Sequence, residues 1–195
     1  MPSWAWIVIV IAAIVVTAAV VWAAMKSRRS RALQERFGPE YDRTVRATDD
    51  KREAEAELAA RAERRDSLDI RPLTPAARER YLAEWQGVQA RFVDDPEGAV
   101  RDADALIQSA MRERGYPVDD FEQRSADISV DHPHVVENYR QGHRLAGGST
   151  EDLRQAMQHY RLLFEELVDS ASDTALSRED GGVVAEDGRT VSRRP

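Results

Sequence analysis

The feature that most constrains this chain is an uncharged apolar stretch close to its start. Residues 4–25, WAWIVIVIAAIVVTAAVVWAAM, number 22 and contain Thr17 as their only polar side chain. A helix rises about 1.5 Å per residue, so this stretch would reach about 33 Å, enough to cross a hydrocarbon core of about 30 Å. We therefore predict a transmembrane helix. The alternative, a buried helix of a globular protein, is disfavoured because no later stretch is apolar enough to surround it.

Aromatic and basic residues mark the two ends of this stretch. Indole rings prefer the headgroup region, and basic residues beside a span favour the cytoplasmic side. The predicted membrane-interface residues are Trp4, Trp6, Trp22, Lys26, Arg28, Arg29 and Arg31. We expect a single-pass protein of the bacterial inner (cytoplasmic) membrane, with its N-terminus outside, its C-terminal domain in the cytoplasm, and anionic lipid at the basic stalk.

Export with cleavage of the apolar stretch is the alternative topology. A cleaved signal peptide has positive residues before a shorter apolar core. Here Met1, Pro2 and Ser3 precede the stretch and carry no side-chain charge. Small residues around Trp22 still offer a cleavage point, so the exported alternative stays open.

Charge and cysteine content exclude several classes of function. The net charge is −7, and residues 67–169 hold 20 acidic against 12 basic side chains. Such a domain is a poor nucleic-acid binder, because phosphate neutralisation needs clustered Lys and Arg. The chain has no cysteine, which excludes disulfides, thiolate metal sites and cysteine nucleophiles. Arginine outnumbers lysine 26 to 2, a bias typical of a GC-rich bacterial genome.

No alternating apolar pattern with hairpin turns occurs, so we predict an all-α protein. Its expected segments are a transmembrane anchor (1–25), a basic stalk (26–38), a charged helical spacer (39–70), a small acidic helical domain of about four helices (71–169) and a disordered tail (170–195). Gly38-Pro39 separates stalk from spacer. The spacer is rich in Glu, Arg and Ala, which favours a solvated rod. A self-associating coiled coil is the alternative, weakened by polar residues at its core positions.

Capping signals and apolar stripes divide the acidic domain. Thr74-Pro75, Asp95-Pro96 and Asp131-His132-Pro133 each predict a helix start, and Gly115 predicts a helix end. Ser149 or Thr150 begins a last helix. The apolar residues of that helix, Leu153, Met157, Tyr160, Phe164 and Leu167, step by four, three, four and three. We interpret this seam as internal core, with a docking groove as the alternative.

The densest polar cluster is DISVDHPH, residues 127–134. Imidazole and carboxylate together suit zinc or iron, so the candidate metal ligands are Asp131, His132, His134 and His143. His134 and His143 are nine residues apart, which places them on opposite sides of one helix. His143 shares the face of Tyr139, so a packed core histidine is favoured over a ligand. No nucleotide-binding, zinc-protease or hydrolase motif occurs, so the catalytic residues stay unknown, and we predict no cofactor.

Two stretches resemble a known family. RGYPVDDFEQRSADISVDHPHVVENYRQGH (114–143) and STEDLRQAMQHYRLLFEEL (149–167) are similar to small bacterial single-pass membrane proteins labelled as hypothetical proteins. The resemblance covers about residues 71–168. It implies a shared domain and brings no activity, cofactor or catalytic residue with it.

Three functions compete on this sequence. The favoured one is a membrane-tethered interaction or scaffold module that binds a protein partner, and it makes an enzyme the less favoured class. The second is a structural envelope protein that self-associates through residues 40–66, so a homo-oligomer stays open. The third is a membrane-anchored, metal-dependent enzyme centred on residues 131–143.

Overall fold

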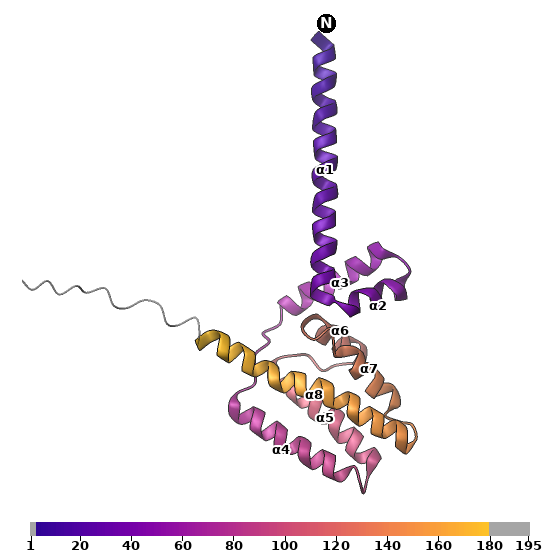
Figure 1. Ribbon diagram of the computed structural model, residues 1–195, viewed down its shortest axis with the longest axis vertical. Coiled ribbons are helices and arrows are strands. Elements are labelled where there is room, and N and C mark those ends of the chain that lie inside the picture. Colours follow the sequence, from indigo (N-terminus) through magenta and orange to yellow (C-terminus); the bar gives the residue numbers. More distant parts are fainter. Residues whose placement is uncertain (1–2, 180–195) are drawn as a thin grey trace, which may run out of the picture. The chain divides into compact units, whose positions relative to one another are not determined.

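The computed structural model of the chain describes residues 3–179, with side chains described for residues 12–169. These residues form eight helices and no strand, which confirms the all-α prediction (Figure 1). The helices are α1 (Ser3–Phe37), α2 (Pro39–Thr48), α3 (Lys51–Asp66), α4 (Pro75–Arg91), α5 (Pro96–Arg114), α6 (Phe121–Asp131), α7 (Val136–Leu145) and α8 (Thr150–Glu179).

Helix α1 is the longest element, at 35 residues. In the part of the chain that the structure describes, no helix combines the length and the apolar character needed to cross a membrane. The transmembrane helix predicted for residues 4–25 therefore has no support there.

The chain divides into two compact units whose boundaries differ from the predicted segments. Unit 1 consists of residues 1–68 and 119–137, and unit 2 of residues 69–118 and 138–195. Residues 119–137, expected within one acidic domain, thus pack with the N-terminal helices instead. Each unit is built from two separate stretches of the chain.

Unit 1 buries the C-terminal end of α1 against α2, α3 and α6. Its apolar core cluster comprises Leu33, Phe37, Tyr41, Leu58, Ala62 and Val130. The solvated rod predicted for residues 39–70 is wrong, because these residues form two packed helices joined by a sharp turn. Asp49 makes that turn with φ +54°, and the carboxylate of Asp50 caps α3 by accepting a hydrogen bond from the Arg52 backbone N–H at 2.7 Å.

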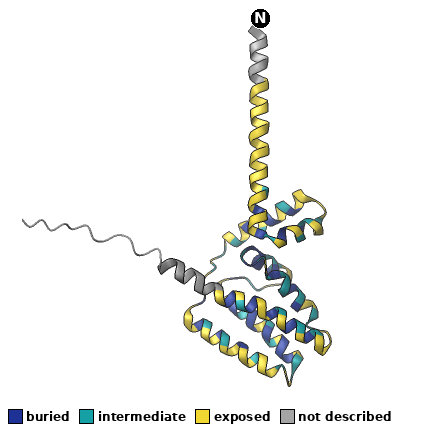
Figure 2. Cartoon of the chain, viewed as in Figure 1, coloured by how far each residue is buried: buried dark blue, intermediate teal, exposed yellow. Residues whose placement is uncertain are grey.

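Unit 2 is formed largely by α4, α5 and α8. The predicted apolar face of α5 is buried, and so is the whole seam of α8, which confirms the interpretation of that seam as core. Trp85 of α4 stacks on Phe164 of α8, with ring centroids 4.5 Å apart. The predicted caps at Thr74 and Asp95 are confirmed by side-chain hydrogen bonds to Ala77 and Gly98 backbone N–H groups. The burial pattern is visible in Figure 2.

Two predicted boundaries are wrong. Asp131 does not start a helix: it is the last residue of α6, and α7 begins at Val136. Its carboxylate accepts hydrogen bonds from Arg65 Nε at 2.7 and 2.8 Å and is thereby engaged elsewhere. The disordered tail predicted from residue 170 begins too early, since α8 continues to Glu179. Residues 180–195 lie outside the described residues.

Replacing glycine by alanine is expected to have opposite effects on stability at two positions of unit 2. Gly115 ends α5 with φ +100°, and a Cβ there would overlap the carbonyl oxygen of Asp69, so Gly115→Ala should lower the free energy of unfolding by at least about 1–2 kcal/mol. Gly87 lies inside α4 with nothing within 4 Å of an added Cβ, so Gly87→Ala should raise that energy by about 0.5–1 kcal/mol. Chemical denaturation of the full chain in mild detergent measures both. A destabilised Gly87→Ala protein would contradict the open space around position 87.

Candidate functional site

The exposed part of α1 carries the longest apolar surface among the described residues. Seven large apolar side chains are 51–67% exposed: Ile14, Val15, Val16, Val20, Val21, Trp22 and Met25. Figure 2 shows this segment of α1 as exposed along its length. Trp4 and Trp6 belong to the same helix, but their side chains lie outside the described residues.

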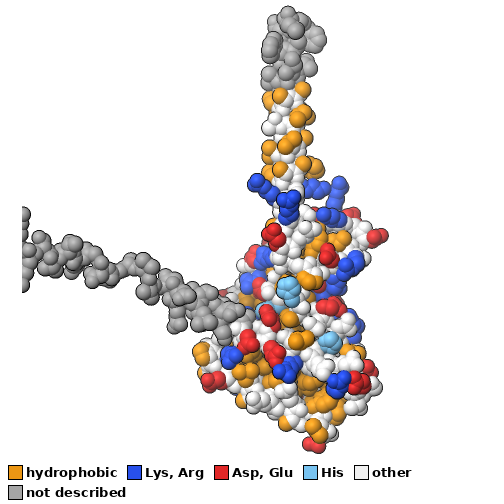
Figure 3. Space-filling view, in the orientation of Figure 1, with side chains coloured by type: hydrophobic (Ala, Val, Ile, Leu, Met, Phe, Trp, Pro, Cys, Tyr) orange, Lys and Arg blue, Asp and Glu red, His pale blue; other side chains and the backbone are white. Residues whose placement is uncertain are grey.

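The basic collar, which we define as Lys26, Arg28, Arg29 and Arg31, lies within α1, directly after the exposed apolar segment. In Figure 3 the Lys and Arg side chains gather at the end of the exposed apolar segment. The Lys26 ammonium lies 5.5 Å from the centroid of the Trp22 ring. Among the described residues, no carboxylate lies within ion-pair distance of any collar residue. Most arginines elsewhere in unit 1 are paired, including Arg43, Arg61, Arg64 and Arg65.

A groove separates the collar from the start of α3. It encloses about 640 Å³ and is lined by Trp22, Lys26, Ser30 and Arg31 from α1, and by Asp50, Lys51, Arg52 and Glu55 at the start of α3. A second hollow of about 450 Å³ shares several of these residues and adds Arg29. Lys51 and Arg52 of α3 thus lie beside the collar, although 20 positions separate Arg31 from Lys51 in the sequence.

Hydrogen bonds fix the acidic residues of this groove. Glu55 accepts one from Ser30 Oγ at 2.6 Å and one from the Tyr41 hydroxyl at 2.8 Å. Burial by itself raises the pKa of Glu55, but the hydrogen bonds from Ser30 and Tyr41 together with the nearby Lys51 ammonium outweigh it, and the pKa lies below its usual value. Lys51 approaches the same carboxylate at 3.6 Å. Four cationic side chains therefore line the groove against two carboxylates, both of which have partners within the chain.

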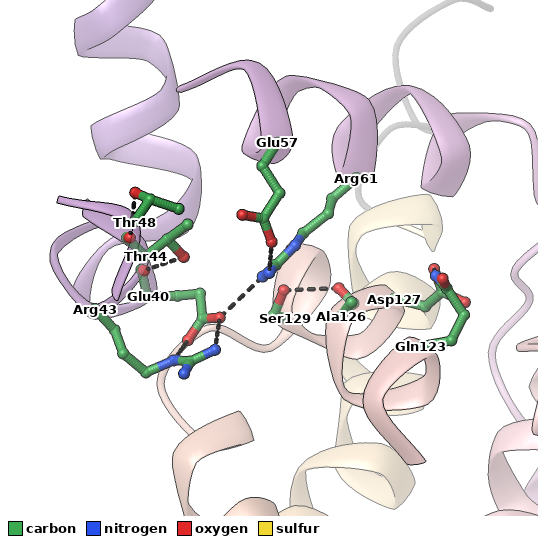
Figure 4. A network of polar contacts seen from close by, with 10 residues as sticks. All are labelled: Glu40, Arg43, Thr44, Thr48, Glu57, Arg61, Gln123, Ala126, Asp127 and Ser129. Carbon is green, nitrogen blue, oxygen red and sulfur yellow. Dashed lines mark hydrogen bonds and ion pairs between the residues drawn. The ribbon is translucent and has the colours of Figure 1, made fainter. Parts of the chain in front are cut away.

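A second polar arrangement lies between α2, α3 and α6 (Figure 4). Glu40, only 1% exposed at its side chain, accepts hydrogen bonds from Arg43 at 2.9 and 3.0 Å and from Arg61 at 3.0 Å. Arg61 also pairs with Glu57. The hydrogen bond to Glu40 is the main cause that raises the pKa of Arg43 above its usual value. These contacts hold α2 on α3.

The structure distributes the predicted metal-binding cluster over both units. Asp131, His132 and His134 belong to unit 1, whereas His143 lies on α7 in unit 2. His132 is buried and follows the last residue of α6, while His134 is exposed and lies near Gly38. The described residues contain no group of three or more His, Asp or Glu side chains placed to hold a metal ion.

The prediction that His143 is a packed core residue is wrong, because its side chain is exposed. The neighbouring Gly142 takes the buried position instead, where an added Cβ would lie 2.6 Å from the ring of Tyr160. The buried face of α7 therefore contains Gly142, and not His143 as predicted from the position of Tyr139.

Sequence reasoning identified the collar residues but missed Lys51, Arg52 and Glu55. They lie in a segment whose composition suggested a solvated rod. The Asp49-Asp50 pair was the available signal, because Asp is tolerated at positive φ and is also a favoured N-cap. A turn there folds α3 back against α2 and brings the start of α3 close to α1.

Comparisons with known proteins do not assign the chain to a family. No family model matches the chain, and neither does a curated protein or a solved structure.

Proposed function

We propose that this protein is a membrane-tethered helical module that binds another protein. The observation that carries the proposal is the order of features along α1: an uncharged apolar stretch, then the basic collar, then packed helices. This order suits a single-pass anchor with its charges at the headgroup layer.

The sequence supports the anchor most directly. Residues 4–25 carry no charge over 22 positions, and the described side chains of α1 between Ile14 and Met25 expose their apolar groups. Contiguous exposed apolar surface of this kind marks a membrane or protein contact. The collar favours the cytoplasmic side for the helices that follow. The resemblance to small bacterial single-pass membrane proteins favours the inner membrane of a bacterium.

The binding role rests on the character of the helical units. Unit 2 buries the apolar seam of α8 in its own core and exposes many charged residues. The excess of acidic residues between 67 and 169 favours a partner with a basic surface over a nucleic acid.

Alkaline carbonate extraction of the full chain tests the anchor. The wild-type protein should stay in the membrane pellet, because an apolar span resists extraction while a peripheral contact does not. Ile14→Asp/Val15→Asp places two charges within the stretch and should release most of the protein, since a central charge strongly disfavours insertion. Ile14→Leu/Val15→Leu is the matched control and should stay in the pellet.

Release of the wild-type protein by carbonate would overturn the anchor. A reporter that works only in the cytoplasm, fused after residue 195, then tests the orientation. Activity supports the cytoplasmic position of the helical units, and its absence in a carbonate-resistant protein contradicts it. Cross-linking from exposed acidic residues of unit 2 tests the partner: a specific basic protein is expected, and a chain that cross-links only to itself contradicts the proposal.

A further inference from the structure

We propose that the groove between α1 and the start of α3 binds the phosphate group of an anionic phospholipid. This inference rests on the membrane anchor proposed above and deepens it, because it assigns a defined binding site to one lipid class. A diffuse electrostatic attraction between the protein and anionic lipids would need only the collar residues. The groove adds Lys51 and Arg52 from a helix distant in sequence.

The charge distribution is the first argument. Among the described residues of unit 1, most arginines outside this region pair with a carboxylate. The cations of the collar do not, and Arg52 forms no ion pair with a described side chain either. Among the described cations that line the groove, Lys51 approaches a carboxylate, that of Glu55 at 3.6 Å. The groove cations without such a partner are suited to an anionic ligand, and phosphate offers oxygens to several of them at once.

The acidic residues of the groove offset only part of this charge. The Asp50 carboxylate caps α3 through the Arg52 backbone N–H at 2.7 Å. Glu55 is held by Ser30 and Tyr41 at 2.6 and 2.8 Å. These donors are uncharged, so both carboxylates keep their charge, and Lys51 lies 3.6 Å from Glu55. The groove still has four cationic side chains against two carboxylates.

The height of the groove along α1 favours a lipid as the source of the phosphate. If Met25 marks the end of the hydrocarbon core, Arg31 lies six residues further, about 9 Å along the helix axis. The headgroup layer on each side of a bilayer is about 5–8 Å thick. The α1 side of the groove between Lys26, about 1.5 Å past Met25, and Arg31 therefore extends through the layer that contains the lipid phosphates.

The polarity of the groove also fits a lipid. Trp22 and Ala23 line the end nearer the apolar segment, whereas Arg31 and Lys51 belong to the polar part. Its volume of about 640 Å³ lies within the range of about 300–1,000 Å³ typical of small-molecule sites. A ligand with an apolar tail and an anionic head matches both ends.

Native mass spectrometry of the full chain, released from nanodiscs of equal parts phosphatidylcholine and phosphatidylglycerol, tests the site. The wild-type protein should retain phosphatidylglycerol in clear preference. Lys51→Gln/Arg52→Gln should weaken this preference by about tenfold, because two cations leave the site. Arg46→Gln/Arg112→Gln removes the same charge at exposed positions outside the groove and should leave it unchanged.

Each other outcome contradicts the site. Equal retention by the Lys51→Gln/Arg52→Gln protein and the wild type would show that the collar alone attracts lipid. Equal loss in both double variants would show a general charge effect. Inorganic phosphate that displaces the retained lipid at millimolar concentration would identify a free phosphate as the ligand. A wild-type protein that does not enter nanodiscs would instead overturn the anchor, which separates the two failures.

Discussion

Arg61→Met is expected to lower the free energy of unfolding of unit 1 by about 3 kcal/mol. Arg61 donates to the carboxylate of Glu40 at 3.0 Å, and the Glu40 side chain is only 1% exposed. Removing one partner of a buried ion pair leaves a charge with too little compensation, which is costlier than the pair itself is stabilising. Arg43 still contacts Glu40, and this keeps the expected loss at the lower end of the range. Amide hydrogen exchange in α3 measures the change.

The matched control removes an ion pair that is solvated. Arg101 lies 3.8 Å from Glu97, with side chains 71% and 74% exposed. Arg101→Met should therefore change stability by less than about 0.5 kcal/mol.

The double variant Glu40→Leu/Arg61→Met sharpens the test. Replacing both charges with apolar groups removes the buried carboxylate that Arg43 compensates only in part, so the double variant should be more stable than Arg61→Met alone. If it is less stable, the charges of Glu40 and Arg61 do not depend on each other as the geometry requires.

Much of unit 2 could be predicted because its signals are local. Thr74 and Asp95 each precede a proline, and capping chemistry acts within one helical turn. The stripes on α5 and α8 repeat at helical spacing, so their burial follows from periodicity. The same reasoning was wrong at Asp131, because an ion pair with Arg65, 66 positions earlier in the chain, decides its role. Local patterns contain no information on such partners.

Unit 1 was harder to predict because polar groups contribute much of its packing. Tyr41, Leu58 and Ala62 are too few to suggest a core when they are read along one helix. They become a core only after the Asp49 turn brings α2 and α3 together, and the contacts of Glu40 with Arg43 and Arg61 accompany that step. The groove depends on the same turn. The collar residues that line the groove could therefore be predicted from the sequence, whereas the lining residues from α3 could not.

Trp85→Ala is expected to lower the free energy of unfolding of unit 2 by about 3–5 kcal/mol. Trp85 is 5% exposed and stacks on the fully buried Phe164, with an interplanar angle of 13°. Truncation would remove the stacking and leave a cavity between α4 and α8 that the surrounding helices can fill only in part. Chemical denaturation of the full chain, followed by hydrogen exchange in α5 and α8, measures the loss.

Trp85→Phe separates the contribution of the ring from that of the indole N–H. Within the described residues this N–H is buried and has no hydrogen-bond acceptor. A buried donor without a partner is destabilising by about 1–3 kcal/mol. Phenylalanine keeps the stack on Phe164 and removes the donor, so the gain should offset much of the lost volume and the net change should stay below about 1.5 kcal/mol. A loss as large as that of Trp85→Ala would mean that the N–H is satisfied, and that the stack contributes less than its geometry indicates.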